Sequence, residues 1–415
     1  MANKVIYVYD SFSTDNEILL GTLYVNNVRG NETFSFEFDF DWLKDNECSS
    51  ALDPELSFIL GRQFSKQKMF GMFEDACPDR WGRVLMQKRE NLNAKKEGRK
   101  PNKLLDSDYL LGVDDYTRMG GLRFKLDKNG PFVSDEKDNS VPPWTSLRTL
   151  EEAAHNFEKD SSNIDKWVEQ LIKPGSSLGG ARPKASVVDT KGNLWIGKFP
   201  SKHDEYDVCA FEKVANDLAL MCGLNVPETK IEKFSKYGST FLVKRFDREN
   251  NRRIHFASAM TLLGKTDNDD SSSYLDLADF IKENGSKPMD DLLELYKRIA
   301  FNIAISNTDD HLRNHAFIYG KNGFRLSPLY DINPVPYNNQ LSLNIDDTSN
   351  DKDFELLLNT CEYYGLDKNK GKQTIVDIVN IVSDNYEKLS NNYGLSRSQI
   401  EDMKNAFTNK KELFI

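Results

Sequence analysis

The residues whose types and spacing could do chemistry lie in the stretch NTDDHLRN, residues 307–314, and at Asp331. Asn314 follows Asp309 by five positions, and Asp331 follows Asn314 by 17. Phosphoryl transfer needs a carboxylate that orients the attacking hydroxyl, and it needs an amide oxygen and a second carboxylate that hold Mg²⁺ against the phosphates. We therefore predict that Asp309 is the catalytic base and that Asn314 and Asp331 bind Mg²⁺.

The same separation of Asp from Asn occurs in the catalytic loop of protein kinases, where a further acidic residue also follows. Two other interpretations stay open. A cluster of Asn, Asp and His after a helix is commonly a solvated turn. His311 and His315 lie four positions apart and could bind a metal ion, but the glutamate of the zinc motif H-E-x-x-H is missing.

Two regular elements are expected to hold this stretch in place. Apolar residues at helical spacing predict a buried helix over residues 290–305, so the stretch begins where that helix ends. Residues 316–319 and 324–329 read as two strands around a turn at 321–323, which predicts a short hairpin. Catalytic side chains are commonly carried by loops between rigid elements, and the predicted arrangement is of that kind.

A second group of candidate residues precedes the first in the chain. Residues 173–184 form a loop rich in glycine and serine, in which Gly179 and Gly180 would let backbone amides approach phosphate oxygens. The loop lacks the Lys-Ser/Thr of a Walker A motif and precedes a strand, so a plain connecting turn is an equally good interpretation. Lys198 in the next strand and Glu212 in the next helix repeat the kinase order of phosphate loop, lysine and glutamate.

The distribution of patterns along the chain predicts the fold class. Residues 3–43 alternate like strands, whereas helical patterns dominate after about residue 247. We predict an α+β, two-lobed protein-kinase-like fold with a β-rich N-terminal region and an all-helical C-terminal lobe. Its expected parts are an N-terminal β-rich subdomain (1–106), a kinase N-lobe with the Gly-rich loop (107–246) and a helical C-lobe with the catalytic and metal-binding loops (247–415).

Composition narrows the protein classes. The chain of 415 residues is long enough for two or three domains, and its net charge of −10 argues against binding nucleic acid through overall charge. Five scattered cysteines without a C-x-x-C pair predict a reducing compartment. No apolar run reaches the roughly 18 residues that cross a bilayer, and the N-terminus lacks a signal-peptide pattern. We expect a cytoplasmic protein without membrane contact.

Seven motifs in a fixed order resemble the HipA family of bacterial serine/threonine kinases, the toxins of HipBA-type toxin-antitoxin pairs. They are FEDACPDRWGR, MGGLRF, SSLGGARPK, the lysine of WIGKFP, VKRFDR, NTDDHLRN and SPLYDINP. The likeness covers nearly the whole chain. We therefore expect the full-length, HipA-like form of the fold with its N-terminal subdomain.

The resemblance implies a role for each matching residue. Asp309 would be the catalytic base, and Asn314 and Asp331 would hold Mg²⁺. The implied ATP-binding residues are Gly179, Gly180, Lys198, Lys244, Phe246, His311 and Tyr330, with Lys184 and Glu212 in support. The family's serine before the glycine loop, whose autophosphorylation silences the enzyme, matches Ser177. Ser176 beside it is an alternative site, and GGARPK replaces the GAQEK of some members.

The resemblance also implies ATP and Mg²⁺ as cofactors and a protein substrate of translation, such as an aminoacyl-tRNA synthetase. A small helix-turn-helix antitoxin of the HipB type would restrain the enzyme, and operator DNA would be contacted only through their complex. One alternative is a kinase of the same fold that acts on a small molecule or a lipid. Another is a binding module that mainly forms a repressor complex, although the full set of catalytic residues argues against it.

Overall fold

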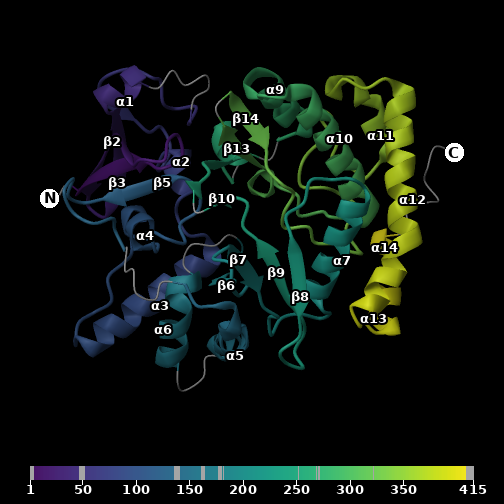
Figure 1. Cartoon of the computed structure of the whole chain (residues 1–415), viewed down its shortest axis with the longest axis horizontal. Helices are drawn as coiled ribbons and strands as arrows, with labels where there is room; N and C mark the ends of the chain where they lie inside the picture. Colours follow the sequence, from purple (N-terminus) through teal and green to yellow (C-terminus); the bar gives the residue numbers. More distant parts are fainter. Residues whose placement is uncertain are drawn as a thin grey trace. The chain divides into compact units, whose positions relative to one another are not determined.

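A computed structural model describes residues 4–45, 52–134, 141–159, 164–175, 180, 182–250, 252–267, 269, 272–320 and 322–407. The chain divides into two compact units, and Figure 1 labels most of their helices and strands. Unit 1 consists of Met1–His203 and Phe234–Ala257, and unit 2 consists of Asp204–Lys233 and Ser258–Ile415. Both units mix helix and sheet, in agreement with the predicted α+β class. The division at residues 106 and 246 stays a prediction.

An antiparallel five-stranded sheet opens unit 1 in the order β4-β3-β2-β1-β5. The alternation of β3 buries Phe34, Phe36 and Phe38 on one face, as its pattern predicts. Phe40, which continues the same aromatic row in the sequence, is 60% exposed because the chain leaves the sheet after Phe38 and begins α1. The bounds are β1 Lys4–Asp10, β2 Ile18–Val28, β3 Asn31–Phe38, α1 Phe40–Asp45, β4 Gln63–Phe64 and β5 Leu122–Lys125.

The remainder of unit 1 packs helices against a second sheet, in which β6 pairs with β7 and β7 pairs with β9, both antiparallel. A buried core that includes Trp81, Leu147 and Trp195 joins α3, α5 and these strands. The helices are α2 Gly71–Glu74, α3 Arg80–Lys96, α4 Asp106–Gly112, η1 Trp144–Ser146, α5 Leu147–Glu158 and α6 Ile164–Gly175. The strands are β6 Lys184–Val188, β7 Leu194–Lys198, β9 Thr240–Lys244, β10 Arg248–Glu249 and β11 Arg252–Arg253. The next strand, β12 Phe256–Ser258, contains the last residues of unit 1 and the first of the following part of unit 2.

A buried ionic network fixes the short link that follows β9. Asp247 is 1% exposed and accepts hydrogen bonds from Arg245 (2.6 and 2.8 Å), Arg248 (2.7 Å) and the N–H of Gly120 (2.9 Å). Burial alone raises the pKa of the Asp247 carboxyl. The charges of the two arginines and the hydrogen bonds outweigh that effect and hold the pKa well below its ordinary value. The link is therefore tied to the turn that carries Gly120.

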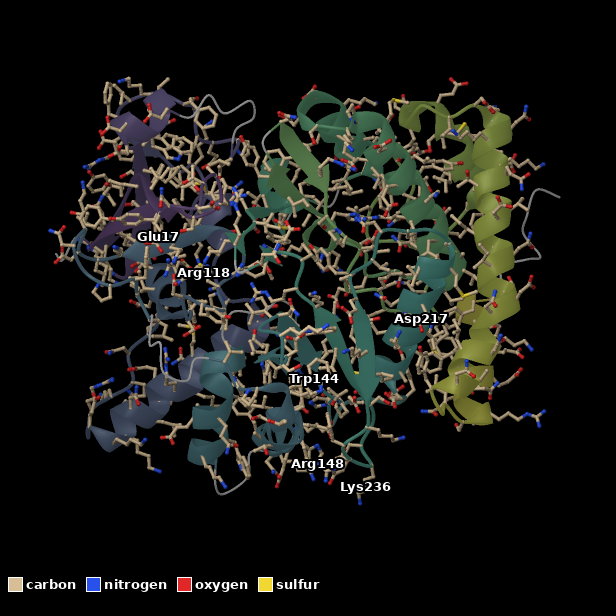
Figure 2. The ribbon with its side chains drawn as sticks, in the orientation of Figure 1. Glu17, Arg118, Trp144, Arg148, Asp217 and Lys236 are labelled. Carbon is tan, nitrogen blue, oxygen red and sulfur yellow. The ribbon has the colours of Figure 1, made fainter. Side chains whose placement is uncertain are left out.

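Arg118, labelled in Figure 2, lies two residues before Gly120 and is also hydrogen-bonded to the surrounding backbone. Its fully buried guanidinium donates to the backbone carbonyls of Ala76, Leu110 and Val113 at 2.8–3.0 Å. Its own carbonyl accepts a hydrogen bond from Arg245 (3.2 Å). The motifs MGGLRF and VKRFDR, far apart in sequence, are thus joined through backbone and side-chain groups of one network.

Helices dominate unit 2. The stripe predicted for residues 290–305 is buried on α10, which packs against α9 and the long α12. Figure 1 shows α7 beside α12, and Asp217 on α7, labelled in Figure 2, accepts hydrogen bonds from Lys213 and from Tyr393 at the end of α12. The helices are α7 Val208–Met221, α8 Ala259–Leu262, α9 Tyr274–Asn284, α10 Pro288–Ile305, η2 Leu312–Asn314, α11 Phe354–Asn359, η3 Cys361–Tyr364, α12 Lys368–Asn392, α13 Arg397–Asp402 and α14 Lys404–Phe407.

Unit 2 also contains strands, so the prediction of an all-helical C-terminal lobe is wrong in this respect. The hairpin predicted after the polar stretch is present as β13 Ala316–Gly320 and β14 Gly323–Leu326, and β8 Thr229–Glu232 follows α7. The hairpin was predicted from its own pattern, whereas the description of the lobe as all-helical followed the helical patterns that dominate after about residue 247. Among the described residues, no helix combines the length and the apolar composition needed to span a bilayer.

Replacing Asp247 with alanine should lower the free energy of unfolding by about 3–5 kcal/mol, because the buried guanidinium of Arg245 and the largely buried one of Arg248 lose their carboxylate. Glu249→Ala removes an exposed carboxylate two positions away and should change it by less than about 0.5 kcal/mol. Because the folded pKa of Asp247 is depressed, its stabilisation is present above the ordinary aspartate pKa of about 4 and declines as pH falls. Urea denaturation at several pH values measures both effects, and equal losses in the two variants would contradict the assignment.

Candidate active site

The polar stretch begins where α10 stops, at a residue in the left-handed conformation. Ser306 has φ 53° and ψ 43°, is fully buried, and donates its N–H to the carbonyl of Ile303. The N–H of Asn307 bonds to the carbonyl of Asn302 (2.9 Å), which closes the helix end. Lys352 donates to the Ser306 hydroxyl at 2.8 Å. The stretch thus leaves a buried, hydrogen-bonded helix end in a fixed direction.

The stretch folds back on itself so that Asp309 and Asn314 become neighbours. The side-chain amide of Asn314 donates to the Asp309 carbonyl (2.8 Å), and the Asn314 N–H bonds to the carbonyl of His311 (2.8 Å) within η2. Because the amide nitrogen is used as a donor, the orientation of the amide is fixed and its Oδ1 is the atom left for a cation. Asp309 is exposed, which fits the catalytic role predicted for it.

Asp331 reaches the same region from the segment after β14. It has φ 59°, which is uncommon for a residue other than glycine and is a form of strain found at functional sites. The amide of Asn333 donates to the Asp331 carboxylate (3.2 Å), and the Asn333 N–H donates to the Asn307 side chain (3.3 Å). Tyr330 donates its hydroxyl to the carbonyl of Arg313 (2.7 Å). The segment that carries Asp331 is therefore hydrogen-bonded to the polar stretch at both ends.

Neighbouring charges shift the pKa of the Asp309 carboxyl. Partial burial raises the pKa of the Asp309 carboxyl, His311 lowers it, and the charges of Asp331 and Asp310 raise it, with a net upward shift. A divalent cation beside Asp331 would offset this repulsion. Among the described residues no group of three or more His, Cys, Asp or Glu could hold a metal ion. Mg²⁺ in phosphoryl transfer is commonly bound through one or two protein oxygens plus phosphates and water, and Asn314 and Asp331 fit that pattern.

The phosphate-binding candidates of unit 1 lie around β6 and β7. Lys184 and Lys198 face each other directly across the two strands and are 4% and 8% exposed. Cross-strand partners share one face of a sheet, so two ammonium groups are brought to the same face beside Gly180. Trp81 at the start of α3 fixes this corner, because its N–H bonds to the Gly180 carbonyl (3.3 Å) and its indole N–H to the Lys184 carbonyl (3.0 Å).

Both the backbone conformation and the surroundings of Gly180 favour glycine at this position. Its φ of 86° lies in the left-handed region, and a Cβ atom there would come within 2.6 Å of the Lys184 ammonium nitrogen. A side chain would therefore strain the backbone and displace Lys184. Gly179, Ser176 and Ser177, the other predicted residues of this loop, lie outside the described residues.

The remaining predicted residues have definite places, although their roles stay predictions. Lys244 ends β9, and the Phe246 ring lies 6.1 Å from that of Phe256. Glu212 is 2% exposed on α7 in unit 2, whereas Lys198 belongs to unit 1. Sequence reasoning missed two buried groups interleaved with these candidates. The first is the Arg245–Asp247 network, which lies beside Lys244 and Phe246. The second is Asp310, which follows Asp309 and is 1% exposed. The alternation of a buried with an exposed Asp has no sequence signature.

The backbone of Asp331 gives a test that is independent of activity. Asp331→Gly should be more stable than Asp331→Ala by about 1 kcal/mol, because alanine is disfavoured at positive φ and glycine is not. Both variants lose the carboxylate and the hydrogen bond from Asn333, so their difference reports the backbone alone. Thermal unfolding of the pair measures it. An alanine variant as stable as the glycine variant would show that Asp331 is not held in this conformation.

Comparison with known proteins identifies relatives. A family model described as the HipA-like C-terminal domain matches residues 176–386. A Haemophilus influenzae protein named "Putative kinase" is 29% identical over 196 residues, which are 40% of this chain and 56% of that protein. The Sinorhizobium fredii protein "Putative kinase Y4mE" is 27% identical over 182 residues, 38% of this chain and 41% of that protein. The chain thus spans only about half the length of these curated relatives.

A solved structure shares the fold over nearly the whole chain. It is HipA of Shewanella oneidensis MR-1 in a toxin-antitoxin complex with HipB and operator DNA. The TM-score is 0.68, with 17% identity, and the match covers 97% of this chain and 94% of that one. At this level of identity the likeness concerns the fold, and it extends through both units.

Proposed function

Because the chain belongs to the HipA family, whose C-terminal domain model matches just over half of it, we propose that it is an ATP- and Mg²⁺-dependent serine/threonine protein kinase and the toxin of a bacterial toxin-antitoxin pair. The observation that carries the proposal is the folded stretch 307–314. In it the Asn314 amide is hydrogen-bonded to the Asp309 backbone, and the Asp331 charge acts on the Asp309 carboxyl. The kinase names of two relatives support phosphotransfer. The choice of serine or threonine as acceptor rests on the family resemblance.

In the proposed reaction, Asp309 orients the acceptor hydroxyl and takes its proton while the hydroxyl oxygen bonds to the γ-phosphorus. The bond from that phosphorus to the β,γ-bridging oxygen breaks, and its electron pair leaves with ADP. Asn314 and Asp331 would hold Mg²⁺, which when bound neutralises charge on the phosphate oxygens. The ATP contacts proposed for the other residues are phosphate binding by Gly179, Gly180, Lys198 and His311, support of Lys198 by Glu212, and a border to the adenine by Lys244, Phe246 and Tyr330.

Self-silencing through the glycine loop is part of the proposal. A phosphoserine carries nearly two negative charges, so one at Ser177 would repel the phosphates of ATP. Arg182 and Lys184 follow Ser177 by five and seven positions and could pair with it. Arg182 already donates to the Phe199 carbonyl (3.4 Å) beside β7. Such pairing would draw the loop away from the nucleotide. Because Ser176 and Ser177 lie outside the described residues, this step is supported by the sequence.

Phosphotransfer is tested by intact mass and peptide mapping after incubation with Mg²⁺ and ATP, beside Asp309→Asn. We expect phosphate on Ser177 or Ser176 of the parent and at least a 100-fold slower reaction in the variant, because an amide cannot accept the proton. Removing Mg²⁺ with a chelator should slow phosphorylation of the parent to a similar extent. Phosphate on both proteins at equal rates would exclude Asp309 as the base. Phosphate on neither, from unmodified protein that binds ATP, would favour a small-molecule or lipid kinase or a binding role.

The matched control for the site of modification is Ser177→Ala. In that variant we expect kinase activity to persist with time while the parent loses it, since the silencing group cannot form. A Ser177→Ala protein that was phosphorylated and inactivated like the parent would move the site to Ser176 or refute the self-silencing mechanism; Ser176→Ala distinguishes these outcomes.

A HipB-like helix-turn-helix antitoxin is the proposed partner, and operator DNA would be contacted through their complex. The Shewanella oneidensis complex supports this, because HipA, HipB and operator DNA are assembled there. The proposed target is a protein of translation, such as an aminoacyl-tRNA synthetase. Gel-shift assays of the antitoxin with Asp309→Asn test whether DNA binding by the complex is separable from phosphotransfer. A loss of the shifted complex in this variant would contradict separability.

A further inference from the structure

A buried carboxylate that the proposed reaction does not use lies directly after the catalytic base. The Asp310 side chain is 1% exposed, and its Oδ2 accepts hydrogen bonds from the Tyr274 hydroxyl (2.7 Å), from His315 Nε2 (2.8 Å) and from the Asn302 amide. An ionised carboxylate is tolerated in the interior when several donors reach it. Three donors on one oxygen thus account for its burial.

The donors come from three different elements. Tyr274 is the first residue of α9, Asn302 lies in the last turn of α10, and His315 directly precedes β13. The pKa of the Tyr274 hydroxyl is raised well above its ordinary value, by burial first and by the Asp310 charge second, so it remains a donor. A single carboxylate therefore joins the two helices and the hairpin that surround the catalytic stretch.

Asn302 extends the connection toward the metal ligand. Its amide nitrogen donates to Asp310, while its oxygen accepts from the Asn307 amide at 3.0 Å. Asn307 in turn accepts from the N–H of Asn333, whose side chain donates to Asp331. Described residues thus form one unbroken chain of hydrogen bonds from Tyr274, through Asp310, to Asp331. Asp309, the proposed base, directly precedes Asp310 in the sequence, and Asp331, the proposed Mg²⁺ ligand, is the last member of these hydrogen bonds.

We propose that Asp310, with its donors Tyr274 and Asn302, is the positioning network of the active site, which holds Asp309 and Asp331 in the mutual arrangement that phosphoryl transfer requires. This inference rests on the proposed function. Because Asp310 is held by three donors, the position of the backbone that also carries Asp309 is restricted. Misplacement of a reacting group by about 1 Å can slow a reaction roughly 100-fold. Loss of one of three donors should loosen Asp310 without releasing it.

The test compares two buried tyrosines that differ in their hydroxyl contacts. Tyr274 and Tyr296 are both fully buried in unit 2. The Tyr274 hydroxyl bonds to Asp310, whereas the Tyr296 hydroxyl finds no hydrogen-bond partner anywhere in the described part of the chain. Tyr274→Phe and Tyr296→Phe therefore delete the same atom from similar surroundings, and only the first deletion touches the network.

The measured quantity is the initial rate of self-phosphorylation as a function of ATP at saturating Mg²⁺. Tyr274→Phe should lower the maximal rate roughly tenfold, within the range expected for a slightly misplaced base, while half-saturating ATP changes less than twofold. Tyr296→Phe should match the parent in both. Thermal unfolding shows whether each variant is folded. A general loss of stability would reduce the folded fraction, and correction for that fraction would restore the rate.

The outcomes separate the inference from the function on which it rests. If the parent transfers no phosphate, the proposed function fails. If the parent is active but Tyr274→Phe, corrected for its folded fraction, retains the parent's maximal rate, the positioning network is refuted. An equal loss of rate in both tyrosine variants would refute it as well, because the hydroxyl contact would then be irrelevant.

Discussion

A carboxylate in a protein interior needs hydrogen-bond donors around it. Asp310 receives three of them, and they connect the elements of unit 2 that surround the stretch 307–314. Its three side-chain donors belong to α9, α10 and the segment before β13, so these elements have one common point of attachment. Asp309, one residue earlier, is exposed. The two adjacent carboxylates thus have opposite surroundings. Asp310 is held by protein donors, and Asp309 is the one proposed to meet substrate.

A similar division occurs in unit 1. Arg245 and Asp247 form a buried ion pair, while Lys244 and Phe246 beside them are only partly buried. The alternation of buried and partly buried side chains runs from the end of β9 through the bend at residues 246 and 247. Residues that hold the link and residues proposed to meet the nucleotide therefore alternate along VKRFDR. A motif of this kind contains structural and functional positions that sequence spacing alone cannot separate.

The sequence predicted the local elements well because their causes are local. Apolar spacing located α10, which has Pro288 in its first turn, and strand-like patterns located the hairpin of β13 and β14. The stretch 307–314 and Asp331 were identified from residue type and spacing. Tyr274 was not, because its bond to Asp310 joins residues 36 positions apart. The left-handed conformations of Ser306 and Asp331 were also missed, because neither residue is a glycine, the residue type that usually signals this conformation.

The claim on which the account depends most is that Asn314 and Asp331 bind the metal ion and that Asp309 faces the transferred phosphate. A crystal structure with Mn²⁺ and a non-hydrolysable ATP analogue, with the metal located by anomalous scattering, tests it directly. We expect a Mn²⁺ peak bonded to the Asn314 side-chain oxygen, the Asp331 carboxylate and phosphate oxygens, with the Asp309 carboxylate directed toward the γ-phosphate. A nucleotide-bound Mn²⁺ ligated by other residues, with Asp309 turned away from the γ-phosphate, would contradict the account.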